Sequence, residues 1–188
     1  MPAITGLLIT ARPILEYLYA DKSAKWLPSL PTLLLFLAGA YPIIVTTTYT
    51  NALYALGKPK VVLALMTLYT SLTWVLGVPL IAKFGFVGIA MAGFIITYLT
   101  FPIVIYQMNK VVRIETWSSL QKPLLASLIM GIITFLLNSF ITHSLLTLVV
   151  TALAGMVIYI LAIYLLDGPR LKSEFSNWFA LIGHRNKV

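Results

Sequence analysis

The sequence predicts an all-α protein, a polytopic bundle of about six transmembrane helices. Of its 188 residues, 60% are hydrophobic and only 10% are charged, whereas a soluble domain has about 45–50% apolar and about 25% charged residues. The apolar residues gather in stretches of about 20 residues, which is the length that spans a bilayer as a helix. No stretch sustains the alternation of apolar and polar residues that a membrane β-barrel requires.

Short breaks separate the apolar stretches. Gly57 and Pro59 mark one break, because glycine commonly ends a helix and proline commonly begins one. A turn at 83–85 and a polar link at 113–122 mark two more, and residues 142–144 make a short hairpin. The spans are therefore expected at 2–19, 31–56, 61–81, 87–109, 123–140 and 145–166, followed by a tail at 167–188.

Two further patterns concern packing and the tail. Gly88 with Ala92, and Thr151 with Gly155, are pairs of small residues four apart, which predict close approach of helices. The tail mixes apolar and aromatic residues with basic ones, which favours an amphipathic helix on the cytoplasmic membrane surface over a plain solubilising end.

The distribution of basic residues predicts the orientation. The chain has 13 Lys and Arg against 5 Asp and Glu, a net charge of +8. If the six spans alternate, and Arg12 is left out because it lies inside the first span, nine basic residues fall on one side and three on the other, and basic loops remain cytoplasmic. We therefore expect a multi-pass protein of the inner (cytoplasmic) membrane with both termini in the cytoplasm. We expect this positive charge to interact with anionic lipid head groups, and we expect no nucleic-acid partner. The nine residues are Lys58, Lys60, Lys110, Arg113, Lys122, Arg170, Lys172, Arg185 and Lys187.

Residues that could perform covalent chemistry are scarce. The absence of cysteine excludes disulfides and thiolate chemistry. The five acids and two histidines show no metal-ligand spacing, and there is no phosphate-binding glycine loop or nucleophile elbow. The sequence therefore predicts no enzyme activity, no metal site and no cofactor.

Only two ionisable residues, Arg12 and Glu16, fall inside a predicted span. Their i, i+4 spacing places them on one helix face, where they can pair. Because a charge inside a membrane costs about 2.5–3.5 kcal/mol on insertion scales, the pair is a candidate for a cavity that meets an anionic head group. A structural pair near the outer membrane interface, with Arg12 reaching toward water, is the alternative.

A polar stripe runs along the second predicted span. Thr47, Asn51, Tyr54 and Lys58 share one face at helical spacing. A polar face is unfavourable against lipid, so it is expected to face protein or water. Two interpretations remain open, namely a hydrated cavity that binds sugar hydroxyls or phosphate, and hydrogen bonding between helices.

Three stretches carry a resemblance to a known family. They are ARPILEYLY at 11–19, NALYALGKPK at 51–60 and VPLIAKFGFVGIA at 78–90. In this order they resemble the C-terminal lobe of polysaccharide and lipid-linked oligosaccharide flippases, the O-antigen or exopolysaccharide transporters of the multidrug/oligosaccharidyl-lipid/polysaccharide exporter superfamily. The resemblance covers residues 2–112.

The resemblance implies a two-lobed transporter that works by alternating access, of which this chain would be the C-terminal part. The implied substrate is an undecaprenyl-pyrophosphate-linked oligosaccharide for cell-surface polysaccharide. The implied partners are membrane lipid and a missing N-terminal lobe or a second chain. Arg12, Asn51 and Lys58 are the positions that could balance the phosphates and line a polar cavity. The alternatives are a multidrug cation antiporter using Glu16, a membrane enzyme of glycan assembly, and a non-transporting membrane subunit of a glycan-assembly complex.

Overall fold

The computed structural model describes residues 1–18, 23–140 and 145–185, and within these ranges every regular element is helical. Five helices are long and apolar enough to cross a membrane, with spans at Leu27–Ala55, Pro59–Phe84, Phe86–Val111, Thr116–Asn138 and Thr147–Asp167. The predicted all-α class is confirmed. The helices are α1 (Pro2–Leu18), α2 (Ser23–Trp26), α3 (Leu30–Ala55), α4 (Pro59–Phe84), α5 (Phe86–Val111), α6 (Thr116–Phe140) and α7 (Leu145–Arg185), with a 3₁₀ turn at Leu27–Ser29.

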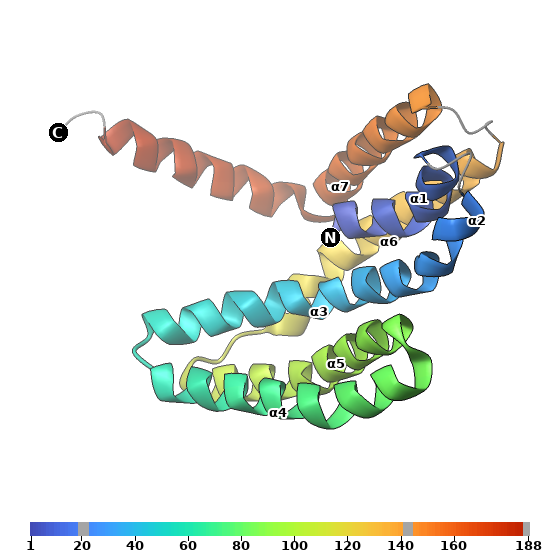
Figure 1. The fold of residues 1–188 in the computed structure, drawn as a ribbon. Helices are drawn as coiled ribbons and strands as arrows, with labels where there is room; N and C mark the ends of the chain where they lie inside the picture. Colours follow the sequence, from blue (N-terminus) through green and yellow to red (C-terminus); the bar gives the residue numbers. More distant parts are fainter. Residues whose placement is uncertain (19–22, 141–144, 186–188) are drawn as a thin grey trace.

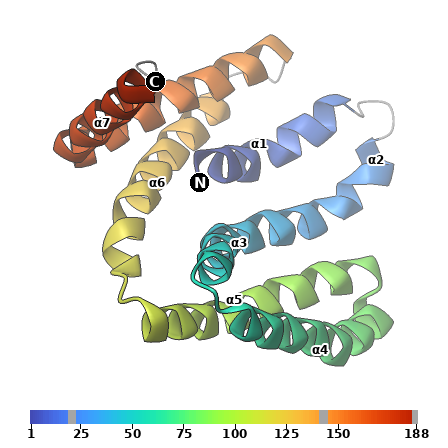
Figure 2. The same cartoon turned by 90° about the vertical axis from the view of Figure 1, so that its left-hand side faces the viewer.

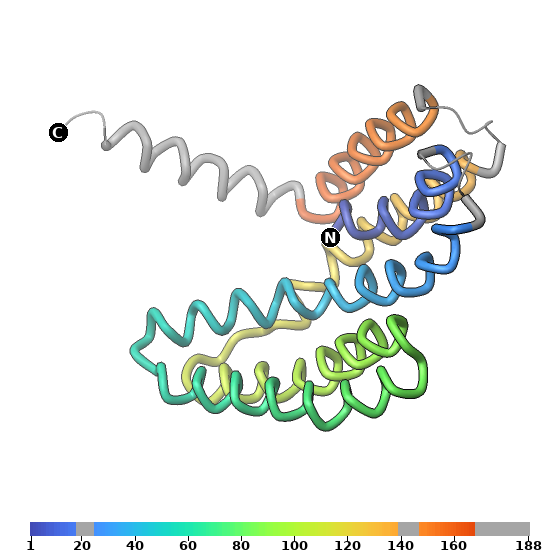
Figure 3. Tube along the Cα trace, viewed as in Figure 1, coloured from blue at the N-terminus to red at the C-terminus, as the bar shows by residue number. Residues whose placement is uncertain are grey.

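Apart from the four-residue α2, the helices form two groups of three (Figures 1 and 2). In one group, α5 packs against both α3 and α4, and in the other α1 and α6 pack against α7. The two groups meet where α1 lies against α3. The link between α5 and α6 carries the chain from the first group to the second (Figure 3).

The best-packed core lies in the first group. Leu53 of α3 and Val62 of α4 are fully buried, and Val104 and Met108 of α5 pack against them. The buried face of α3 also carries Val45 and Tyr49, so it repeats at three- and four-residue intervals as an amphipathic packing face does. The side chains on the opposite face of α3 therefore point away from this group.

Two glycines make the connections within the first group short. Gly57, with φ 68°, follows α3, and Pro59 begins α4. Gly85, with φ 59°, is the only residue between α4 and α5. Positive φ is strained for residues with a Cβ, which explains why both turns fall at glycines.

Polar contacts join the two groups. The hydroxyls of Thr5 and Tyr41 lie 2.6 Å apart between α1 and α3. The Tyr49 hydroxyl lies 2.5 Å from Oγ1 of Thr116 at the start of α6. Hydroxyl pairs of this kind commonly hold membrane helices together.

The predicted span at 2–19 corresponds to α1, which has 17 residues and is not among the five helices long enough to cross a membrane. Helix α4 ends at Phe84, three residues after the predicted end at 81.

Two further boundaries differ more. Helix α6 begins at Thr116, and not at Pro123 after a polar link. Pro123 is the eighth residue of α6, so the helix continues through a proline in its interior, which removes one backbone hydrogen bond, and the polar residues before it form the first two turns. Helix α7 continues to Arg185, but its backbone leaves helical geometry at Asp167 (φ −141°, ψ 21°), where the tail was predicted to begin.

An ion pair lies at this kink. Lys122 of α6 donates a short hydrogen bond from Nζ to the Asp167 carboxylate. The contact joins α6 to the end of the spanning part of α7, on the side of the bundle that the sequence predicts to be cytoplasmic. The prediction that the tail forms an amphipathic helix on the membrane surface depends on side chains after Asp167, which lie outside the described residues.

Candidate functional site

The six candidate residues fall into two separate groups in the structure. Arg12 and Glu16 lie on α1, and their predicted pairing is confirmed, because Arg12 Nε donates to Glu16 Oε1 at 2.8 Å. The Arg12 side chain is 71% exposed and that of Glu16 is 36% exposed. An exposed i, i+4 pair stabilises a helix by only about 0.3–0.5 kcal/mol. The pair therefore contributes little to the fold.

The polar stripe lies on the outer face of α3. Thr47, Asn51 and Tyr54 are exposed, opposite the buried face formed by Val45 and Leu53. Lys58 is exposed too, but α3 ends at Ala55, so Lys58 continues the stripe from the turn and not from the helix itself. The predicted shared face therefore holds for the first three residues.

The hydrogen bonds of α3 distinguish the stripe from its neighbours. Thr46, Thr48 and Thr50 each donate a hydroxyl hydrogen bond to a backbone carbonyl one turn earlier, at 3.1, 2.8 and 2.7 Å. Across the described ranges, the side chains of Thr47, Asn51, Tyr54 and Lys58 make no hydrogen bond or ion pair. The four stripe residues thus keep their side-chain polar groups available for a ligand or for water.

The two groups lie at different depths. The Thr5–Tyr41 contact places these two residues at one level, and α1 and α3 run in opposite directions (Figure 2). Arg12 is seven residues after Thr5, and Thr47 is six after Tyr41. At 1.5 Å per residue they are about 20 Å apart along the helix axes. The six residues therefore do not form one cluster, and the stripe is the site to consider.

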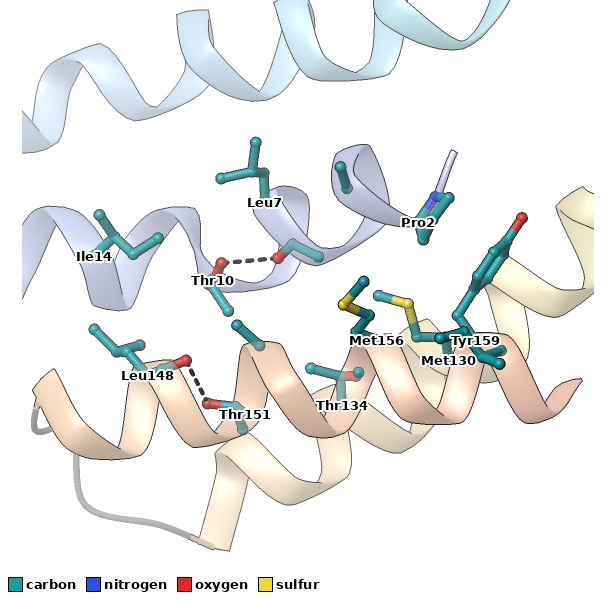
Figure 4. Close-up of a pocket in the computed structure, with 15 residues that line it drawn as sticks. Pro2, Leu7, Thr10, Ile14, Met130, Thr134, Leu148, Thr151, Met156 and Tyr159 are labelled. Carbon is teal, nitrogen blue, oxygen red and sulfur yellow. Dashed lines mark hydrogen bonds between the residues drawn. The ribbon is translucent and has the colours of Figure 1, made fainter. Parts of the chain in front are cut away.

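A groove that the sequence did not reveal lies between α1, α6 and α7 (Figure 4). Its volume is about 610 Å³, and none of the six candidate residues lines it. The pair Thr151 and Gly155, predicted to serve packing, lies in its wall. An ideal Cβ on Gly155 would stand 3.4 Å from Thr134 Oγ1, so this glycine does allow α6 and α7 to approach. The groove could have been suspected from the threonines on these helices, but not located.

The side chains of the stripe are suited to noncovalent binding. In the part of the chain that the structure describes, no three His, Asp or Glu side chains gather as metal ligands would. The stripe offers a hydroxyl, an amide, a phenol and an ammonium group, which together bind hydroxylated and anionic groups.

The fold and the stripe define a polytopic helical membrane protein with a polar surface on the outer face of α3. Comparison with models of protein families, with curated proteins and with solved structures finds no match.

Proposed function

We propose that this chain is one lobe of a membrane flippase that moves an undecaprenyl-pyrophosphate-linked oligosaccharide across the cytoplasmic membrane. The observation that carries the proposal is the unpartnered polar stripe on the outer face of α3, a helix apolar enough to span the bilayer. The resemblance of residues 2–112 to flippase C-terminal lobes supports the same function.

The physical argument begins with the environment of the stripe. Lipid offers no hydrogen-bond partner, so an unsatisfied polar group exposed to lipid costs several kcal/mol. A hydrated path along α3 would remove this cost. Such a path would also replace the water around a sugar head group that cannot enter hydrocarbon alone.

The order of side chains along the stripe suits the substrate. Thr47, Asn51 and Tyr54 can exchange hydrogen bonds with sugar hydroxyls, and the Lys58 ammonium at the end can balance a phosphate. A second lobe, from another segment or a second copy, would close the path and alternate its exposure between the two sides. The lipid chain would stay in the bilayer during the movement, and no bond would form or break.

The cation-antiporter alternative depends on Glu16. An antiporter needs a carboxylate that is free to take up a proton or a metal cation. Here the Glu16 carboxylate accepts a hydrogen bond from Arg12. This pairing favours the flippase over the antiporter.

The first prediction concerns water along the stripe. Because the chain has no cysteine, a cysteine introduced at one position is the only thiol that can react. In intact membranes, Asn51→Cys is expected to react at least about tenfold faster with a membrane-impermeant maleimide than Leu63→Cys. A thiol reacts as its thiolate, which forms readily in water and not in lipid. Each position lies four residues from the end of its helix at the α3–α4 turn, and Leu63 is 67% exposed. Equal, slow reaction at both positions would place the stripe in lipid.

The second prediction concerns transport. In proteoliposomes, where two copies of the chain can supply the two lobes, the wild-type chain should expose a fluorescent undecaprenyl-pyrophosphate disaccharide of the inner leaflet to external dithionite. Lys58→Met is expected to slow this exposure about tenfold or more, because a charge-assisted hydrogen bond contributes about 1.5–3 kcal/mol.

Matched controls separate this effect from a change in charge or folding. Lys60→Met removes the same charge two residues away, in the first turn of α4, and Thr48→Val removes a hydroxyl that is bound to the Ile44 carbonyl at 2.8 Å. Both are expected to transport at the wild-type rate. Equal loss in Lys58→Met and Lys60→Met would instead indicate that only the net charge matters and would refute a specific role for Lys58.

A further inference from the structure

The part of the polar stripe that lies on α3 follows a proline in the interior of that helix. Pro42 is buried, and Thr47, Asn51 and Tyr54 all come after it. Proline has no amide hydrogen, so the carbonyl four residues earlier, that of Ala38, loses its usual helical donor. Inside a membrane span such a carbonyl is unfavourable unless another group binds it. The half of α3 that carries the stripe therefore joins the rest of the helix where one backbone hydrogen bond is missing.

Tyr98 of α5 supplies the missing donor. Its hydroxyl donates to the Ala38 carbonyl oxygen at 3.2 Å. The two helices come close here, because an ideal Cβ on Gly39 would lie 3.9 Å from the Cα of Phe94. The rings of Phe94 and Tyr98 pack with their centroids 4.6 Å apart. A side-chain hydroxyl of one helix thus takes the place of the backbone amide that proline removes from another.

The prolines inside α1, α4, α5 and α6 have no such partner. Across the described ranges, no side chain donates to the carbonyl four residues before any of them. These prolines and carbonyls are Pro13 with Ile9, Pro79 with Val75, Pro102 with Tyr98, and Pro123 with Ser119. The hydroxyl donor is therefore a particular feature of the proline that precedes the stripe.

A second hydroxyl contact holds α3 beside the same proline. Tyr41 directly precedes Pro42, and its hydroxyl lies 2.6 Å from Oγ1 of Thr5 on α1. Two neighbouring helices therefore bind α3 within one turn of Pro42, α5 at Ala38 and α1 at Tyr41. The direction in which α3 continues beyond the proline decides where the stripe lies relative to both groups of helices.

We propose that Tyr98 is a positioning residue for the polar stripe, because its hydrogen bond to Ala38 replaces the one that Pro42 removes and fixes the direction of residues 43–55. Without this bond the carbonyl is unpaired, and the two halves of α3 can change their angle at the proline, which is where sharp helix kinks commonly lie. The positioning requires only the fold, whereas its consequence for transport rests on the flippase proposed above.

The first test is a double-mutant cycle on the full chain in mixed micelles. Tyr98→Phe leaves the Ala38 carbonyl unpaired, so the unfolding equilibrium constant is expected to rise about five- to thirtyfold. In Pro42→Ala the helix supplies its own amide to this carbonyl. Adding Tyr98→Phe in that background is expected to raise the constant by less than about threefold, as for an ordinary interhelical hydrogen bond in a membrane. Equal effects in the two backgrounds would overturn the proposal.

Two substitutions serve as controls. Tyr106→Phe removes a hydroxyl of α5 that binds no described residue, and it keeps the ring beside Lys110, so the unfolding constant should not change. Pro79→Ala restores an amide in α4, where no side chain replaced it. Tyr98→Phe is therefore expected to have its full effect in the Pro79→Ala background. If Pro79→Ala suppressed the effect as Pro42→Ala does, the rescue would reflect general helix stability and the proposal would be wrong.

A distance measurement tests the positioning separately from stability. Nitroxide labels at Leu33→Cys and Ala55→Cys lie on exposed positions in the two halves of α3, about 33 Å apart along the axis of a straight helix. Electron double resonance is expected to show a shifted or broadened distance distribution in Tyr98→Phe. Adding Tyr98→Phe to Pro42→Ala is expected to leave the distribution unchanged. An unaltered distribution in Tyr98→Phe alone would refute the positioning role.

Neither measurement uses a lipid-linked sugar, so the two proposals can fail separately. A chain that passes both tests but exposes no fluorescent substrate to dithionite would refute the flippase and leave the role of Tyr98 intact.

Discussion

Gly88→Ala is expected to destabilise the protein by about 3 kcal/mol or more, at the upper end of what overpacking causes. An ideal Cβ at Gly88 would lie 2.1 Å from the Leu80 carbonyl oxygen and 2.8 Å from the Ile81 nitrogen. Both are backbone atoms of α4, so no side-chain rotation relieves the clash. The α4 and α5 backbones would have to separate at their closest point. The measurement is the free energy of unfolding in mixed micelles as the fraction of denaturing detergent rises.

The matched control lies five residues further along the same helix. Gly93→Ala places a Cβ no closer than 3.9 Å to Phe36 Cε1, which is ordinary van der Waals contact. Replacing an unstrained helical glycine by alanine stabilises a protein by about 0.4–1 kcal/mol. The two substitutions are therefore expected to have opposite signs. If Gly88→Ala changed stability as little as Gly93→Ala, the close approach of α4 to α5 would be incorrect.

Leu53→Ala is expected to lower the free energy of unfolding by about 2–5 kcal/mol, the range for a leucine removed from a packed core. Leu53 is 0% exposed and lies in the cluster with Val62, Val104 and Met108. Its loss leaves a cavity shared by α3, α4 and α5. In a membrane the effect comes from lost van der Waals contacts and not from exposure to water, because lipid is as apolar as leucine.

The control for this substitution is Leu63→Ala. Leu63 lies on α4 near the same end of the group, and it is 67% exposed. Lipid can fill the space that its side chain leaves, so the free energy of unfolding should change by less than about 1 kcal/mol. Both variants are measured by the same micelle titration. A similar decrease in the free energy of unfolding in both would mean that α3 and α5 do not share a tight core.

The element boundaries that local chemistry decides could be predicted from the sequence. Gly57, Pro59 and Gly85 marked the ends of helices, and the structure places α3 and α5 within two residues of the predicted 31–56 and 87–109. Pro123 misled the prediction because a proline is compatible with a helix start but does not require one there. The short α2 helix, with four residues, lacked the length for a periodic pattern.

The candidate site could be predicted only where its residues are neighbours along one helix. The Arg12–Glu16 pair and the shared face of Thr47, Asn51 and Tyr54 follow from helical spacing. That the two groups lie at opposite depths depends on how α1 lies against α3, which no local pattern determines. The groove at Thr134 brings together three helices far apart in the sequence, so it needed the folded chain.

The single-residue connection at Gly85 also constrains biogenesis. A translocon that delivered α4 to the bilayer first would leave α5 to follow through a loop, but Gly85 alone joins the two helices. Because the two helices turn directly into one another, we expect the two segments to enter the lipid together as one helical hairpin.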